Sequence, residues 1–189
     1  MLCFNSDVVP RVDTVTDLGI VVDRNLNFAE YINTCVSKAF SRSFLIFKGF
    51  TCRNSQLLVK AFITYARPLE YNTFIWSPSA VGSINKIERV QRRFTKRIPS
   101  VSSLSYNDRL KALGLDSLEY RRLRYDLVMM YKIVHNLVDL DRDALITISS
   151  NATRNSLFKI YKPTSISSVR SKFVCVRSIN AWNSLPEET

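Results

Sequence analysis

The residues best suited to chemistry lie between Ser83 and Ile98, where cationic and apolar side chains recur at helical spacing. The apolar positions are Ile84, Ile87, Val90, Phe94 and Ile98, and the cations are Lys86, Arg89, Arg92, Arg93, Lys96 and Arg97. At about 100° per residue, the apolar set spans an arc of about 120° and the cations take the opposite side. The pattern predicts one helix with a dry face and a cationic face.

The cationic face has two open interpretations. Most charge runs are solvated surfaces, but a solubilising helix usually interleaves both signs to form i,i+4 ion pairs. Glu88 is the only acid in this stretch. The scarcity of acids favours contact with nucleic-acid phosphates. Such contact would neutralise the phosphate charge without recognising the base sequence.

A second basic group comprises Arg121, Arg122 and Arg124, in the first two turns of a predicted long helix. Cations at a helix N-terminus oppose the helix dipole, so another interaction must offset their position. Contact with nucleic acid and local ion pairing with Glu119 or Asp126 are both open interpretations.

The number and spacing of the cysteines, histidine and glycines argue against several other kinds of functional site. The four cysteines form no Cys-x-x-Cys pair and His135 is the only histidine, so no zinc site of recognised spacing is predicted. We expect the cysteines to be reduced and structural. A lone histidine among basic residues argues against Ser-His-Asp and Cys-His catalysis. The glycines are too far apart for a dinucleotide or Walker A loop.

The acidic cluster Asp139, Asp141 and Asp143 is the remaining metal candidate. Catalytic metals need several oxygen ligands that converge on one point. These aspartates fall in a predicted loop, so we interpret them as a solvated helix end and turn, and we predict no cofactor for this chain.

Composition agrees with a nucleic-acid partner. The chain has 189 residues, of which 46% are hydrophobic, enough for one ordinary domain or two small ones. Lys+Arg 27 against Asp+Glu 16 leaves a net charge of +11, which indicates nucleic acid first and an anionic membrane surface second. No segment has the apolar length of a membrane span or the pattern of a secretory signal, so we expect an intracellular protein that is not secreted.

The element pattern predicts a mainly α chain. A strand or hairpin arm is expected over 13–23, with Gly19 in its middle. Helices are expected over about 28–48 after an Asn27 capping box, from Ser55 to a kink or end at Pro68, over 83–98, over 106–113, and from an Asp116 capping box to about Val138. The expected spine of the last helix is Leu123, Leu127, Met130 and Val134, widened by Tyr120, Tyr131 and Leu137. Trp76 and Trp182 are expected to be core anchors rather than stacking platforms for bases.

Four segments of the sequence carry a signal more specific than composition or helical periodicity. They are LEYNTFIWSPS, IERVQRRFTKRI, SYNDRLKALGLDSLEYRRLRYDLVMMYKIVH and INAWNSLPEE. In this order they resemble the C-terminal part of the reverse transcriptase polyprotein of jockey-like non-LTR (LINE-type) retrotransposons, and the resemblance covers nearly the whole chain. It implies a primer-grip-like strand region over 1–24, thumb-like helices over 25–98, post-thumb helices over 99–138 and an irregular basic C-terminal appendage over 139–189.

The resemblance also implies a function. The chain would hold RNA and DNA template–primer through phosphate contacts, independently of sequence, in the nucleus and cytoplasm. Its partners would include the fingers and palm that it lacks, and the divalent metals would belong to that palm. The chain departs from the family in having Tyr31 where a histidine is usual and in lacking the aromatic-x-Asp-Asp motif. It is therefore not expected to polymerise alone. A domesticated stand-alone RNA-binding or assembly protein, or a decayed remnant, is the alternative.

Overall fold

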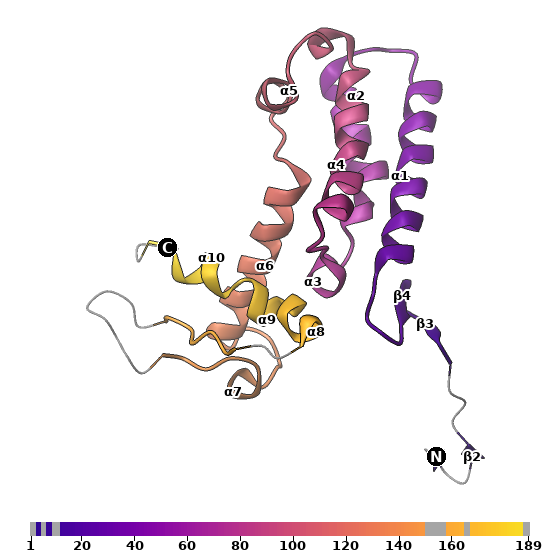
Figure 1. The fold of residues 1–189 in the computed structure, drawn as a ribbon. Coiled ribbons are helices and arrows are strands. Elements are labelled where there is room, and N and C mark those ends of the chain that lie inside the picture. The colour runs from indigo at the N-terminus through magenta and orange to yellow at the C-terminus, as the bar shows by residue number, and fades with distance from the viewer. Residues whose placement is uncertain (1–2, 5–6, 9–11, 150–157, 165–166, 187–189) are drawn as a thin grey trace.

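The chain folds as a hairpin followed by a helical bundle, seen in a computed structural model that describes all residues except 1–2, 5–6, 9–11, 150–157, 165–166 and 187–189 (Figure 1). Helices make up 62% of the structure and strands 6%, which confirms the predicted mainly α class. Figure 1 shows long helices standing side by side, with the hairpin at the lower right and the C-terminal helices at the lower left.

The β-branched N-terminal run forms an antiparallel hairpin of β3 (Thr14–Asp17) and β4 (Ile20–Asp23). Leu18 and Gly19 between them both have positive φ, 45° and 81°, as a two-residue hairpin turn requires. Ile20 is 2% exposed and joins the core, so β4 packs against the first helix. Strands β1 (Cys3–Phe4) and β2 (Asp7–Val8) pair as a separate antiparallel ladder.

The bundle contains the next group of elements. They are α1 (Ala29–Gly49), α2 (Ser55–Ala61), the π-helix η1 (Phe62–Ala66), the 3-10 helix η2 (Arg67–Glu70), α3 (Thr73–Trp76) and α4 (Val81–Lys96). Two predicted caps are corrected. Asn54, rather than Ser55, caps α2, with its Oδ1 accepting from the Leu57 N–H at 3.1 Å. The N-cap of α1 is Phe28, and Asn27 accepts only from the Ala29 N–H.

The chain then turns through shorter elements. They are the 3-10 helix η3 (Pro99–Val101), α5 (Tyr106–Leu113) and α6 (Leu118–Val134). Gly114 has a φ of 62° and closes α5 as predicted. Ser117, rather than Asp116, caps α6 by accepting from the Tyr120 N–H at 3.1 Å. The left-handed Asn136 follows the end of α6, which lies short of the predicted Val138.

The buried face of α6 differs from the expected apolar spine. Its buried residues are Leu118, Arg122, Asp126, Met130, Ile133 and Val134. Met130 and Val134 are buried as the predicted spine requires, but Leu123 is 39% exposed, so that spine position is wrong. The residues expected to widen the spine are also exposed, Tyr120 by 57%, Tyr131 by 45% and Leu137 by 62%. The buried side of the helix therefore differs from the predicted one, because it includes Arg122 and Asp126, and Asp126 forms an ion pair with Arg177. The periodicity of apolar residues does not detect buried charges of this kind.

Two hydrophobic clusters lie along the molecule. The larger joins the hairpin, α1–α5 and the start of α6, and it includes Trp76, 1% exposed, which confirms its prediction as a core anchor. Tyr31 meets the Trp76 ring edge-on at 5.4 Å. The smaller cluster joins the second half of α6 to the C-terminal segment, and Met130, Cys175 and Ile179 are at most 2% exposed in it.

The C-terminal segment, expected as an irregular appendage, carries four short helices in its described part. They are α7 (Arg142–Leu145), α8 (Ser168–Lys172), α9 (Val174–Arg177) and α10 (Ile179–Asn183). Trp182 was expected to be a core anchor, but it is only partly buried: it packs against the smaller cluster and donates from Nε1 to the Phe158 carbonyl at 2.9 Å.

Candidate nucleic-acid interface

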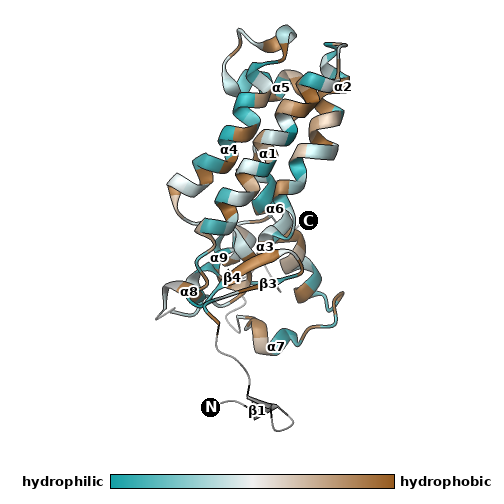
Figure 2. Cartoon of the chain, turned by 90° about the vertical axis from the view of Figure 1, so that its right-hand side faces the viewer, coloured by the Kyte–Doolittle hydropathy of each residue, from teal (hydrophilic) through white to brown (hydrophobic). Residues whose placement is uncertain are grey.

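Helix α4 separates its apolar and cationic side chains as predicted. Ile87, Val90 and Phe94 are at most 1% exposed, and the Phe94 ring lies 4.4 Å from the ring of Phe62 and 4.9 Å from that of Phe47. All six predicted cations of this helix and its C-cap are exposed. Figure 2 shows hydrophilic residues on the outer side of α4 and hydrophobic ones toward its neighbours. We call these six cations the α4 cationic face.

One row of this face leans toward α1. The Lys86 Nζ donates to the Asn33 Oδ1 at 3.0 Å. The Arg93 guanidinium lies over the Phe40 ring at 5.6 Å, and that of Arg97 lies over Phe47 at 4.3 Å. Rings beneath guanidiniums fix the direction of long side chains while leaving the outer N–H groups available to an anion.

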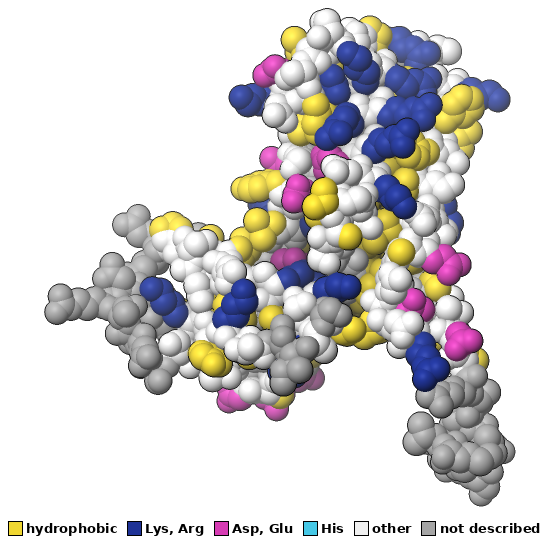
Figure 3. Space-filling model, viewed as in Figure 1, with side chains coloured by type: hydrophobic (Ala, Val, Ile, Leu, Met, Phe, Trp, Pro, Cys, Tyr) yellow, Lys and Arg dark blue, Asp and Glu magenta, His cyan; other side chains and the backbone are white. Residues whose placement is uncertain are grey.

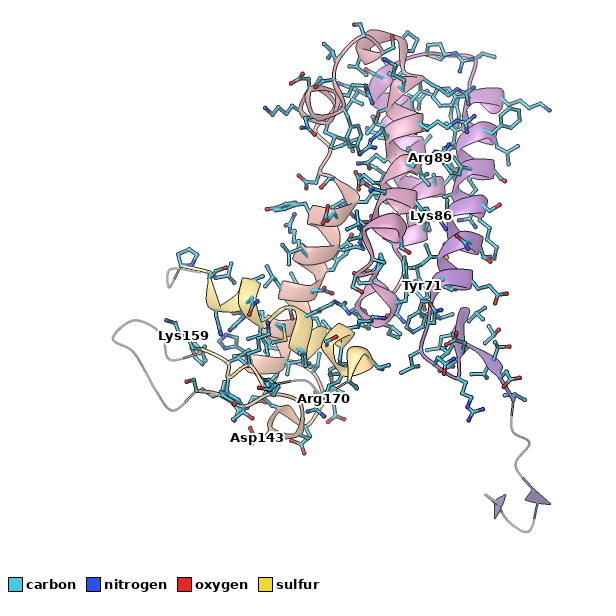
Figure 4. The ribbon with its side chains drawn as sticks, in the orientation of Figure 1. Tyr71, Lys86, Arg89, Asp143, Lys159 and Arg170 are labelled. Carbon is cyan, nitrogen blue, oxygen red and sulfur yellow. The ribbon has the colours of Figure 1, made fainter. Side chains whose placement is uncertain are left out.

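The other row leans toward α5. The Arg92 guanidinium lies 4.9 Å from the centroid of Tyr106, and the Lys96 Nζ donates to the Ser102 carbonyl at 2.7 Å. Arg89 falls between the two rows at about 100° per residue. Figure 4 shows Lys86 and Arg89 along the same helix.

The cationic surface extends beyond α4. Arg53 follows α1, lies over Phe47 at 5.7 Å, and donates to the Phe47 and Phe50 carbonyls at 3.1 and 3.2 Å. Arg53 therefore shares one ring with Arg97. Figure 3 shows Lys and Arg side chains gathered over the upper half of the bundle. Sequence reasoning missed Arg53, because no helical periodicity connects it to α4.

Glu88, the only acid near these cations in sequence, points away from them. It is 6% exposed and its Oε2 accepts from the backbone N–H groups of Leu118 and Glu119, at 2.9 and 3.3 Å. The Tyr106 hydroxyl donates to the other oxygen. Burial and the hydrogen bond to Glu88 raise the pKa of Tyr106. The carboxylate thus satisfies the N-terminus of α6, and no acid interrupts the exposed side of α4.

A polar layer continues beside Glu88. Gln91 is 0% exposed, donates to the Asp116 carbonyl at 2.8 Å and accepts from Arg67 at 3.4 Å. Arg109 is 4% exposed and donates to the Thr95 hydroxyl at 3.2 Å and the Leu104 carbonyl at 2.7 Å. These contacts hold α5 and α6 in fixed positions against the inner side of α4.

The three arginines of the second predicted basic group, Arg121, Arg122 and Arg124, differ in their exposure. Arg124 is exposed. The Arg121 Nε donates to the Glu70 Oε2 at 3.0 Å, and its guanidinium lies over Tyr125 at 5.2 Å. Arg122 is 3% exposed, and burial lowers its pKa. Arg122 must therefore be removed from the predicted contact surface, because its guanidinium cannot reach a phosphate outside the protein.

Glu70 is the ion-pair partner that the sequence did not identify for Arg121. Its side chain is 4% exposed, and burial raises its pKa while the hydrogen bond from Arg121 acts in the opposite direction. Arg67 lies 3.8 Å from the same oxygen. Two guanidiniums therefore neutralise one buried carboxylate between η2 and α6.

The acidic cluster has a structural role. Asp141 caps α7 by accepting from the N–H groups of Asp143 and Ala144 at 3.1 and 3.2 Å, and Asp143 pairs with Arg142 at 3.0 Å. Within the described part of the chain, no cluster of His, Cys, Asp or Glu is arranged to hold a metal. No described helix has the length and apolar character to cross a membrane.

No protein-family model, no curated protein and no solved structure matches the chain.

Proposed function

We propose that this chain is the thumb and post-thumb part of a LINE-type reverse transcriptase and that it holds template–primer RNA and DNA through the α4 cationic face. The observation that carries the proposal is a helix whose six exposed cations meet no acid on their own side, since Glu88 is buried behind them. Fingers and palm from the same polyprotein would be its partners, in the nucleus and cytoplasm.

Phosphate contact is the chemistry that suits this surface. Five of the six side chains are held over a ring or by one hydrogen bond, and all six are exposed. A row of exposed guanidiniums and ammonium groups matches a strand of phosphates. Such contacts position a nucleic acid without reading its sequence, as a polymerase that copies any template requires.

We expect the isolated chain to have no DNA polymerase activity on an RNA or a DNA template. Nucleotide transfer requires two metals held by converging carboxylates, and the palm motif that supplies them is missing from the sequence. Primer extension in Mg²⁺ or Mn²⁺ measures this. Incorporation that is abolished by Asp139→Asn with Asp141→Asn would contradict the expectation.

The main test of the proposal is the salt dependence of binding. Replacing Arg89, Arg92, Arg93 and Lys96 by Gln should keep the helix and reduce the slope of log K against log salt by about 2 to 4 units, at about 0.9 per phosphate contact. Affinity for a random-sequence duplex is measured from low to physiological salt, with circular dichroism to confirm folding. Preference among base sequences should not change.

A matched control removes the same charge elsewhere. Arg24, Lys60, Arg170 and Lys172 are exposed and lie outside α4, so their replacement by Gln should leave most of the slope intact. Equal slopes for wild type and the α4 variant would make the α4 cationic face an ordinary solvated surface and would refute the proposal.

A further inference from the structure

A stripe of aromatic, apolar and cationic side chains lies on α6, away from the α4 cationic face. It consists of Arg121, Tyr125, Val128 and Lys132, which recur at i, i+4, i+7 and i+11 and so share one side of the helix. Tyr125 is 39% exposed and Val128 47%. An exposed ring beside cations is a surface on which a nucleobase can stack.

A pocket of about 260 Å³ opens between this stripe and α3. Its lining includes Phe74, Tyr125, Val128, Met129 and Lys132, together with the acidic Glu70. The volume is below the range of about 300–1,000 Å³ that takes drug-sized ligands. A space of this size with mainly apolar walls suits one flat ring, and the exposed Lys132 in its lining can meet a charged group.

The Tyr125 ring is held in place before any ligand arrives. Glu70 accepts from Arg121 at 3.0 Å, and the Arg121 guanidinium both lies over the Tyr125 ring at 5.2 Å and donates to its hydroxyl. The buried Glu70 carboxylate therefore orients the Arg121 guanidinium, and this guanidinium orients the Tyr125 ring. Arg121 is thus held by Glu70 and Tyr125 while its side chain stays partly exposed.

The charge around the pocket favours an anionic ligand. Glu70 is neutralised by two guanidiniums, at 3.0 and 3.8 Å. The acids of α6 itself do not face the stripe, because Asp126 is buried and paired and Glu119 lies on the other side of the helix. Lys132 and the neighbouring Arg124 are exposed.

From this geometry we propose a second nucleic-acid site, in which the α3–α6 pocket takes one unpaired base of a single strand, stacked on Tyr125, with a flanking phosphate at Lys132. Bases of a duplex are already paired and stacked, so they cannot enter. The site is independent of the proposed duplex contact on α4 and would stand if that proposal failed.

The test compares Tyr125→Leu with wild type on a short single-stranded oligonucleotide and on a blunt duplex. Loss of one stacking platform should weaken single-strand binding about 5- to 150-fold and leave duplex binding unchanged. Tyr125→Phe should retain most of the affinity, because it keeps the ring. An oligonucleotide with 2-aminopurine should show quenching by wild type that Tyr125→Leu abolishes.

Two controls make the result specific. Tyr120→Leu removes another exposed ring of α6 that does not line the pocket, and it should bind like wild type. An abasic oligonucleotide should bind wild type and Tyr125→Leu equally. Unchanged single-strand affinity of Tyr125→Leu, an equal loss on duplex, or an effect confined to self-association of the chain would overturn the proposal, and the last would assign the pocket to a protein contact.

Discussion

Arg177→Ala is expected to lower the free energy of unfolding by about 3–5 kcal/mol, because it leaves a buried carboxylate without its partner. The Arg177 Nε and Nη2 donate to the two oxygens of Asp126 at 2.8 and 2.7 Å, and the Asp126 side chain is 7% exposed. The same guanidinium donates to the carbonyls of Thr73, Phe74 and Lys172, at 3.4, 3.1 and 2.6 Å. Chemical denaturation measures the loss.

The controls separate the ion pair from general charge. Arg170→Ala removes an exposed cation of the same C-terminal segment and should change stability by less than about 0.5 kcal/mol. Combining Arg177→Met with Asp126→Leu should cost less than Arg177→Ala, since no uncompensated charge is left inside. A double variant as unstable as the single one would show that the carbonyl contacts, rather than the ion pair, stabilise this junction.

Local structure was largely predictable from the sequence. The Gly114 helix end and the two faces of α4 follow from backbone rules and a 3.6-residue period, which act within a few residues. Such signals are independent of the rest of the chain, so the sequence predicts them well. The run over 13–23 was expected to be extended, and the structure places a turn at Gly19 inside it.

Buried charge was not predictable in the same way. Arg122 and Asp126 occupy the inner side of α6 at i and i+4, where an apolar spine was expected. The partner of Asp126 lies in α9 and that of Arg121 in η2. A charged side chain is normally exposed unless it is paired, and pairs so distant in sequence leave no periodic signal in either helix.

The buried polar layer of α4 was partly predictable: its spacing is regular in the sequence, but its burial was not expected. Glu88, Gln91 and Thr95 recur at i, i+3 and i+7 next to the apolar arc, and all three are buried. Their spacing was visible in the sequence, and it marked a second inner stripe that faces α5 and α6. The apolar arc alone did not predict this stripe, because polar side chains at these positions are usually exposed.

Glu88→Ala should therefore destabilise the fold by about 3 kcal/mol and leave nucleic-acid binding by the folded protein unchanged. The substitution removes the acceptor of two N–H groups at the start of α6, where Leu118 is 0% exposed, and orphaned buried donors cost about 1–3 kcal/mol each. Thermal and chemical unfolding measure the loss, and Glu119→Ala, an exposed acid one residue into α6, is the matched control that should cost less than about 1 kcal/mol. Because the carboxylate lies behind the α4 cationic face, the salt slope should equal that of wild type. Higher affinity with unchanged stability would place Glu88 among the exposed cations and contradict the buried cap.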